Sequence, residues 1–253
     1  MCEPFVVNRF TGKIAFITGA GSGIGRAVTV RIVEEGGTVF AVDISDTALK
    51  EIADLVGENV HINVADVGDP DACARALANC IGVFGRLDVL GNVAGIYRAA
   101  HTPEMAREEY RRVMSVNLDG PFYLCQTAIP HLLEAGGNIV NIASNSGIQG
   151  VPYSAAYSAS KGGIIQLTRS LAVEFLKTAL RVNAIAPAGT NTNIAISAGF
   201  PPDMDPDLSS RMAGLRGMAE PGEVAGLFAY LASDEARSVT GAVYTIDNGI
   251  TVS

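Results

Sequence analysis

The chain has 253 residues, of which 48% are hydrophobic and 17% charged, a balance typical of a globular protein and opposite to that of a disordered one. Its formal charge of −8 offers no basic surface to neutralise nucleic-acid phosphates, so we expect no nucleic-acid partner. The one basic cluster, Arg107, Arg111 and Arg112, alternates with Glu108 and Glu109, as on a solvated helix face.

Neither a membrane span nor a metal site is expected. No apolar run reaches the roughly 20 residues that cross a bilayer, and the N-terminus lacks the basic region and apolar core of a signal peptide. The cysteines and histidines are scattered without paired spacing, which predicts neither structural disulfides nor a metal site. We therefore expect a soluble, cytoplasmic protein with no membrane partner.

Short apolar runs alternate with helical patterns along the chain. The first run, Lys13–Thr18, ends in glycines and precedes a helical stretch over Ile24–Glu35. Further strands are expected at Thr38–Asp43, Val60–Asn63, Leu87–Asn92, Asn138–Ser144, Arg181–Ile185 and Val243–Ile246, and further helices at Thr47–Val56, Pro70–Phe84, Pro103–Leu133, Ala155–Leu176 and Gly222–Leu231. This alternation predicts one α/β domain over residues 1–253, with a doubly wound, seven-stranded parallel sheet covered by helices on both faces.

One long segment, residues 186–220, is irregular and rich in Pro, Gly, Asn and Ser. A connection of this length inside a compact domain is typical of a lid or binding loop. A surface excursion without a function is the alternative.

A glycine-rich stretch, Thr18 to Gly25, lies between the first strand and the first helix. Glycines there allow a tight turn and a close approach to a pyrophosphate, while the helix N-terminus supplies N–H donors. The second strand ends in Asp43, from which a carboxylate can accept hydrogen bonds from an adenosine ribose. Asp43 can instead begin a turn, although Asp46 is the better candidate for capping the next helix. The pattern predicts a dinucleotide site.

Tyr157 and Lys161 are four residues apart and share one face of a predicted helix. A phenol is a poor base at neutral pH, but a neighbouring ammonium stabilises its anion. Such a pair is a weak signal alone and needs corroboration from other motifs.

Four motifs in register supply that corroboration. The chain carries Gly19-xxx-Gly23-x-Gly25, Asn92-Val93-Ala94-Gly95, Asn117, and Ser144 followed by Tyr157-xxx-Lys161. In this order and at these separations they resemble the short-chain dehydrogenase/reductases of the compact single-domain type, over nearly the whole chain, from about Thr11 to Gly249. The resemblance implies a Rossmann fold and hydride transfer between NAD(H) and a secondary alcohol or ketone.

The resemblance also implies catalytic roles. Ser144 is expected to hydrogen-bond the substrate oxygen, and Tyr157 to donate or accept the proton. Lys161 is expected to lower the pKa of Tyr157 and to bind the nicotinamide ribose. Asn117 is expected to hold a water in a proton relay.

Cofactor contacts follow from the same resemblance. Asp66 and Val67 are expected to contact adenine, Asn92 to shape the loop over the cofactor, and Thr190 and Thr192 to reach the nicotinamide carboxamide. The full set of expected cofactor residues is Gly19, Ser22, Gly23, Ile24, Gly25, Asp43, Ile44, Asp66, Val67, Asn92, Ala94, Gly95, Tyr157, Lys161, Pro187, Thr190 and Thr192.

The chain departs from the family pattern at three places, one of them Asn248 in place of a Gly near the C-terminus, and it lacks the cations of the NADP-dependent members. Val93 replaces a second Asn of the family, and Ala188 replaces the Gly that follows Pro187, which leaves the loop's contact with the carboxamide open. NADP users of the family tend to carry Arg or Lys where this chain has Ser22 and Ile44. Together with Asp43, this predicts NAD as the cofactor.

Three alternatives stay open: an NADP-dependent enzyme similar to 3-oxoacyl carrier reductases, a non-catalytic NAD-binding regulator, and a methyltransferase, which has no use for Ser144, Tyr157 and Lys161 together. The substrate could be a sugar, a steroid, a small ketone or a 3-oxoacyl chain. The family assembles as tetramers, and the helical stretches Pro103–Leu133 and Ala155–Leu176 carry more apolar side chains than one buried face requires, so we expect a homotetramer.

Overall fold

The computed structural model describes residues 8–210, 212, 214 and 216–252, so Cys2 lies outside the described residues. Seven strands form one sheet: β1 (Ile14–Thr18), β2 (Thr38–Asp43), β3 (Val60–Val64), β4 (Val89–Asn92), β5 (Asn138–Ile142), β6 (Arg181–Pro187) and β7 (Val243–Ile246). The helices are α1 (Gly23–Glu34), α2 (Asp46–Val56), α3 (Pro70–Phe84), α4 (Arg107–Met114), α5 (Gly120–Ala135), α6 (Ala155–Glu174), α7 (Pro206–Ser210) and α8 (Pro221–Ala232). The expected α/β class is confirmed.

The strand order is β3-β2-β1-β4-β5-β6-β7, with every neighbouring pair parallel. The chain winds outward in one direction from β1 to β3 and then returns to start β4 on the other side of β1. In open parallel sheets, ligands bind above the carboxyl ends of the strands at such a reversal. The reversal between β1 and β4 therefore marks where a ligand site is expected.

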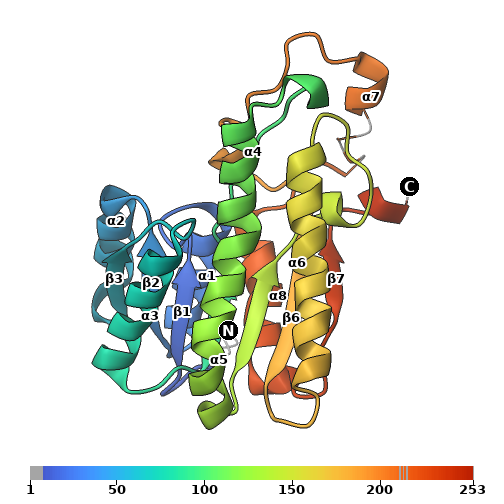
Figure 1. The fold of residues 1–253 in the computed structure, drawn as a ribbon. Helices are drawn as coiled ribbons and strands as arrows, with labels where there is room; N and C mark the ends of the chain where they lie inside the picture. The colour runs from blue at the N-terminus through green and yellow to red at the C-terminus, as the bar shows by residue number, and fades with distance from the viewer. Residues whose placement is uncertain (1–7, 211, 213, 215, 253) are drawn as a thin grey trace, which may run out of the picture.

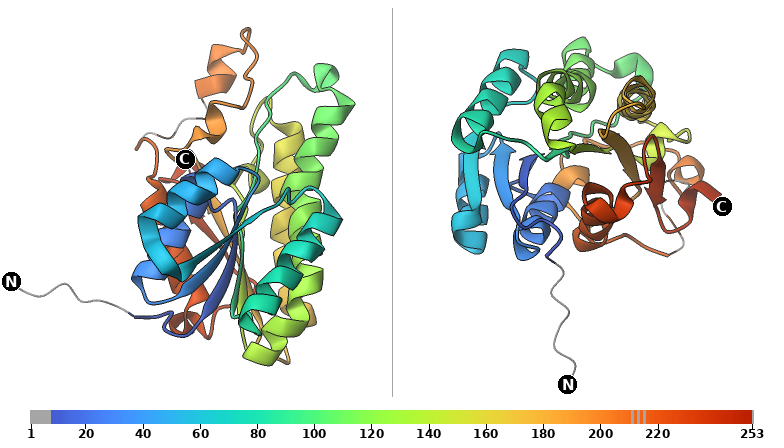
Figure 2. Two further views of the ribbon diagram at one scale, coloured as in Figure 1. Left: turned by 90° about the vertical axis from the view of Figure 1, so that its left-hand side faces the viewer. Right: turned by 90° about the horizontal axis from the view of Figure 1, so that it is seen from below.

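Two helical layers cover the sheet (Figure 1, Figure 2). One core cluster joins one face of the sheet to α1, α2 and α8 through residues such as Val28, Leu49 and Phe228. The other joins the opposite face to α3, α5 and α6, for example through Leu77 and Leu124. The central strands β1, β4 and β5 are buried, whereas the edge strands β3 and β7 are half exposed. The expectation of strands buried on both faces therefore holds at the centre of the sheet and not at its edges.

The expected single helix over Pro103–Leu133 is wrong in detail. Met105 and Ala106 are extended, with ψ of 116° and 140°, so α4 begins only at Arg107. From there the chain stays helical to Ala135, but Ser115–Asp119 form a π-helical turn between α4 and α5. Such turns are rare and often lie at functional sites.

Two other boundaries move because side chains cap the following turn. Strand β5 ends at Ile142 and not at Ser144, since the Ser144 hydroxyl accepts a hydrogen bond from Ser146 N at 3.2 Å and starts a 3₁₀ turn. Ser45, and not Asp46, caps α2, with its hydroxyl accepting from Ala48 N at 3.3 Å. Local hydroxyl bonds of this kind end regular structure early.

The long segment after β6 rises above the carboxyl end of the sheet and carries the short helix α7 (Figure 1). Backbone bonds join it to the loop after β4, with Ala99 N donating to Ala198 O at 2.7 Å. This segment therefore lies over the edge of the sheet where a ligand is expected.

Candidate functional site

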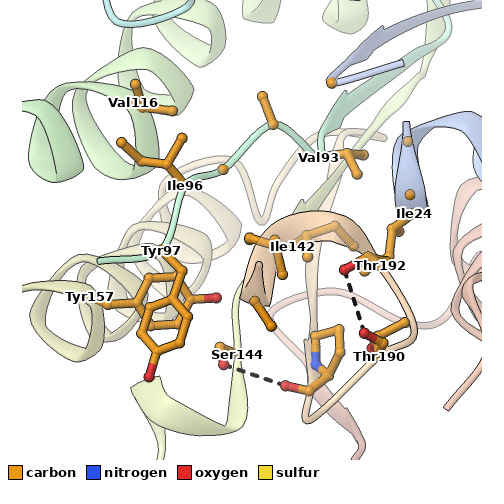
Figure 3. Close-up of a pocket in the computed structure, with 18 of the residues that line it drawn as sticks. Ile24, Val93, Ile96, Tyr97, Val116, Ile142, Ser144, Tyr157, Thr190 and Thr192 are labelled. Atoms are coloured by element: carbon orange, nitrogen blue, oxygen red, sulfur yellow. Dashed lines mark hydrogen bonds between the residues drawn. The ribbon is translucent and has the colours of Figure 1, made fainter. Parts of the chain in front are cut away.

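A cavity of about 470 Å³ opens at the carboxyl edge of the sheet. Its wall is built from the glycine loop after β1, the ends of β2 to β6, the start of α6 and the segment after β6. Figure 3 shows side chains from these separate elements facing one space. Residues far apart in sequence are thus gathered at the predicted edge.

The glycine loop packs too closely for side chains. A Cβ on Gly25 would lie 2.0 Å from the carbonyl oxygen of Gly19, and one on Gly19, whose φ is +65°, would lie 2.9 Å from Ala94 Cα. Ser22 precedes the first residue of α1 and gives it no side-chain cap. The first N–H groups of α1 are thus not capped by Ser22 and can meet an anion at this helix end.

The Asp43 carboxylate is fixed beside this loop. Its Oδ2 accepts a hydrogen bond from Gly21 N and its Oδ1 from Ser45 N, both at 3.0 Å. Asp43 thus starts a turn, as one interpretation of the sequence predicts, and its contact with an adenosine ribose stays a prediction. Next to it, Ile44 is 62% exposed and also lines the cavity.

Asp66 is held by an ion pair that the sequence interpretation missed. Its carboxylate accepts from Arg112 Nη1 at 2.8 Å and from Gly68 N at 2.9 Å. Burial alone would raise the pKa of Asp66, but these bonds outweigh it and hold the pKa below its usual range. Arg112 is solvent-exposed, as expected for a solvated helix face, and it also lines the cavity beside Asp66.

The loop after β4 is shaped by Thr18 more than by Asn92. The Thr18 hydroxyl accepts from Val93 N at 2.9 Å and from Ala94 N at 3.0 Å. Asn92 is buried and donates to Asn141 Oδ1 on β5 at 2.8 Å. The Asn92 side chain therefore turns into the sheet, in contrast to the expectation that it shapes the loop over a cofactor.

Ser144, Tyr157 and Lys161 lie together on the cavity wall. Ser144 follows β5, while α6 carries the other two on one face, as their spacing predicts. The Ser144 hydroxyl lies 3.4 Å from the Pro187 carbonyl oxygen (Figure 3). Lys161 Nζ donates to Ile142 O at 2.7 Å and stands 5.8 Å from the centre of the Tyr157 ring.

Burial is the main cause of the shifted pKa values of Tyr157 and Lys161. It raises the pKa of Tyr157 to about 12, with the Ser144 hydroxyl lowering and Tyr97 raising it by smaller amounts. Burial also lowers the pKa of Lys161 to about 8. Desolvation therefore opposes the charged form of both side chains, and the lowering of the Tyr157 pKa by Lys161 stays a prediction.

Asn117 lies in the π-helical turn and joins two elements of the site. Its Oδ1 accepts from Ile96 N at 2.9 Å, and its Nδ2 donates to Ile96 O at 2.9 Å and to Ser160 Oγ at 3.1 Å. Both amide protons are therefore used within the protein. The amide holds the loop after β4 against α6, next to Lys161.

The segment after β6 closes the other side of the cavity. Pro187, Thr190 and Thr192 all line it. Thr190 donates to Ala188 O at 3.1 Å, and Thr192 donates to Thr190 O at 3.4 Å (Figure 3). A Cβ on Gly23 would lie 3.1 Å from Thr192 Cγ2, so this segment meets the glycine loop across the cavity.

Sequence reasoning missed several lining residues, chiefly Ile96, Tyr97, Val116, Ile142, Val151, Ile194, Met212 and Met218. Ile96 and Tyr97 directly follow the Asn92–Gly95 motif, so their position after β4 was a usable signal. Met212 and Met218 come from the irregular segment, whose path no local pattern specifies. Among the residues that the structure describes, no group of His, Cys, Asp or Glu could hold a metal ion.

The chain is similar to known oxidoreductases over nearly its whole length. A family model described as enoyl-(acyl carrier protein) reductase matches residues 19–251. Meso-2,3-butanediol dehydrogenase of Serratia marcescens is 36% identical over 249 residues, 97% of each chain. The 3-oxoacyl-[acyl-carrier-protein] reductase FabG of Thermotoga maritima is 39% identical, covering 96% of this chain and 100% of the relative.

Solved structures agree with this similarity. Levodione reductase superposes with a TM-score of 0.88 at 32% identity, covering 97% of this chain and 100% of that one. A 3-ketoacyl-(acyl-carrier-protein) reductase from Brucella melitensis, complexed with NADH, gives 0.87 at 28% identity, covering 95% and 99%. A short-chain type dehydrogenase/reductase from Mycobacterium marinum gives 0.87 at 30% identity, covering 98% of both chains.

Proposed function

Because the chain belongs to the short-chain dehydrogenase/reductase family, we propose that it transfers a hydride between NAD(H) and a ketone or secondary alcohol, with Tyr157 donating or accepting the proton. The observation that carries this proposal is that Ser144, Tyr157 and Lys161 line the same cavity as the glycine loop and Asp43. A proton donor and a dinucleotide cradle thus face one space. A non-catalytic regulator would have no need of that arrangement, and neither would a methyltransferase.

The described residues fit a dinucleotide. Added Cβ atoms on Gly19 and Gly25 would clash with neighbouring backbone, so this loop presents bare backbone, and the start of α1 adds N–H donors. The bound cofactor would supply or accept the hydride. Asp43 and Ile44 would hold its adenosine ribose, Asp66 and Val67 its adenine, and Pro187, Thr190 and Thr192 its nicotinamide end.

In this proposal each polar side chain has a distinct task. Ser144 donates a hydrogen bond to the substrate oxygen and so stabilises the charge that develops there. Tyr157 transfers the proton to or from that oxygen. Lys161 places a positive charge beside Tyr157. Asn117 holds the loop after β4 against α6 through its hydrogen bonds to Ile96 and Ser160.

We propose NAD(H) over NADP(H) on the basis of charge. The 2′-phosphate of NADP(H) carries about two negative charges, which Asp43 would repel. Neither Ser22 nor Ile44 brings the cation that would offset this repulsion. The NADP-dependent alternative is kept open by the relatives named as 3-oxoacyl reductases.

The role of the long segment, the oligomeric state and the location of the protein are also proposals. We place the segment at 186–220 over the substrate. We infer a homotetramer, because exposed apolar residues lie on α4, α5 and α6, among them Tyr110, Phe122 and Val173. A stable monomer in light scattering would contradict this.

No described helix is long and apolar enough to cross a membrane. The three described cysteines are free buried thiols, which suits the reducing cytoplasm.

The proposal is tested with the purified protein, NADH or NADPH, and a panel of ketones and secondary alcohols, read by nicotinamide absorbance. We expect turnover with NADH on at least one neutral ketone. We also expect a preference for NADH of at least about 10² in kcat/KM, to which repulsion by Asp43 and the lack of a cation at Ser22 and Ile44 both contribute. Binding of NADH without turnover of any panel member would support the regulator instead. Binding of S-adenosylmethionine and not of NADH would support a methyltransferase.

A further inference from the structure

Tyr97 packs directly against the proposed proton donor. It follows Gly95 and Ile96 in the loop after β4, and its ring centre lies 4.6 Å from that of Tyr157, with the two planes tilted by 49° (Figure 3). It lines the same cavity. A flat side chain here can lie beside a bulky group attached to the reacting carbon.

Two further contacts hold the Tyr97 ring in place. Its hydroxyl shares a 2.6 Å hydrogen bond with Ser154 Oγ, and the buried Ser154 also donates to Pro152 O at 2.9 Å. On another side, Phe200 of the segment after β6 stands edge-on at 5.5 Å. Tyr97 is thereby fixed between the start of α6 and the overlying segment, and burial raises its pKa, so the ring stays uncharged.

The cavity end around Tyr97 holds no charge for an anionic substrate. Among the described residues that line the cavity, the charged side chains are Asp43, Asp66, Arg112 and Lys161. Asp43 faces the glycine loop, and Arg112 is paired with Asp66. Lys161 donates to Ile142 O beneath Tyr157. The remaining side chains that line the cavity are uncharged, and the apolar ones include Ile96, Val151, Ile194, Ala195, Met212 and Met218.

The cations nearest in sequence to Tyr97 are engaged elsewhere. Arg98 donates through Nη1 to the backbone oxygens of Tyr97 and Ser197. His101 lies 3.0 Å from Asp203 Oδ1, outside the residues that line the cavity. Both side chains therefore hold the overlying segment to the loop after β4 and leave the cavity wall neutral.

We propose that Tyr97 is a specificity-determining residue, a fixed aromatic wall against which the apolar, uncharged body of a ring-containing ketone or alcohol lies during reaction. This inference rests on the proposed function and narrows its substrate class. A carboxylate or phosphate on the same ring would be buried against Tyr97 without a partner, at a large cost. A short substrate such as acetone would not reach the wall.

The test compares 4-methylcyclohexanone with 4-oxocyclohexanecarboxylate, two ketones of matched shape and different charge, and uses acetone as the short reference. The proteins are the full-length wild type, Tyr97→Ala, Tyr97→Phe as the matched control that keeps the ring, and Tyr97→Arg, which adds a cation. Steady-state kcat and KM are measured with NADH. Calorimetric binding of the two ring ketones to the NADH-loaded protein is measured in parallel, and melting temperatures check folding.

We expect the wild type to favour the neutral ring ketone by at least about 10² in kcat/KM. Tyr97→Ala should lose about tenfold for that ketone, mainly through KM, and much less for acetone, whereas Tyr97→Phe should keep most of the activity. Tyr97→Arg should shift the preference toward the carboxylate by about tenfold or more, a gain that misfolding cannot produce.

The outcomes separate the two proposals. Equal or better use of the carboxylate by the wild type, or an unchanged ring preference in Tyr97→Ala, overturns the role of Tyr97 while the oxidoreductase assignment stands. Absence of turnover with every ketone overturns the proposed reaction. In that case the calorimetric preference for the neutral ring, and its loss in Tyr97→Ala, still decides whether Tyr97 forms the wall.

Discussion

The charge of Asp43 gives a quantitative test of cofactor choice. Its carboxylate accepts backbone hydrogen bonds from Gly21 and Ser45 at 3.0 Å, so it is fixed in place. Two like unit charges about 4 Å apart repel by about 4 kcal/mol at an effective dielectric near 20. Asp43 is only partly buried, and screening at such a site cuts this to about 2 kcal/mol, or roughly 30-fold in binding.

The perturbation is Asp43→Asn, which removes the charge and keeps the shape. One amide oxygen can still accept from Gly21 or Ser45, while the other bond is lost. We expect the ratio of kcat/KM for NADH over NADPH to fall by about 10- to 30-fold, chiefly because NADPH is no longer repelled and is used better, with a smaller loss for NADH from the weaker hydrogen bond to its ribose.

The control is Asp54→Asn, which removes the same charge from an exposed residue of α2 outside the cavity. We expect the cofactor ratio to change by less than about twofold, because exposed distant charges are screened. The assay is side-by-side steady-state kinetics with both cofactors. A wild type that uses NADPH as well as NADH would refute the reasoning, as would equal effects of the two substitutions.

Two further predictions concern the reaction site. Ser144→Ala should reduce kcat by about 10²- to 10³-fold with NADH affinity unchanged, as for loss of one oxyanion donor; a loss below about threefold in stopped-flow assays would exclude that role. Burial lowers the pKa of Lys161 from 10.5 to about 8, so between these values the unfolded chain binds more protons at this residue than the folded one. This group therefore makes the free energy of unfolding rise with pH, by at most about 3 kcal/mol across the window. Urea unfolding of the cofactor-free protein below and above pH 8 should show this rise, and Lys161→Met should remove it; an identical pH profile in the variant would contradict the burial argument.

The sequence was sufficient to predict the layers of the fold and the gathering of the motifs. Val/Ile/Leu runs alternating with helical patterns can bury their apolar faces only as a covered parallel sheet, and the carboxyl ends of its strands then meet at one edge. Tyr157, Lys161 and Ser144 consequently meet the glycine loop there, as their spacing indicates.

Features that depend on tertiary packing were less predictable. The ion pair of Asp66 with Arg112 joins residues 46 positions apart, and nothing in the local pattern of α4 distinguishes Arg112 from its solvated neighbours. The inward turn of Asn92 depends on Asn141 in the neighbouring strand. The raised pKa of Tyr157 follows from burial, which four-residue spacing does not reveal.

The central claim is that Tyr157 transfers the proton in a nicotinamide-dependent reaction, and Tyr157→Phe tests it most directly. The substitution deletes one oxygen, so NADH binding by fluorescence and thermal stability should stay close to wild type. Turnover of the best neutral ketone with NADH should fall by at least about 10², the usual contribution of a general acid. A variant that binds NADH normally and retains more than about a tenth of wild-type turnover would contradict the account.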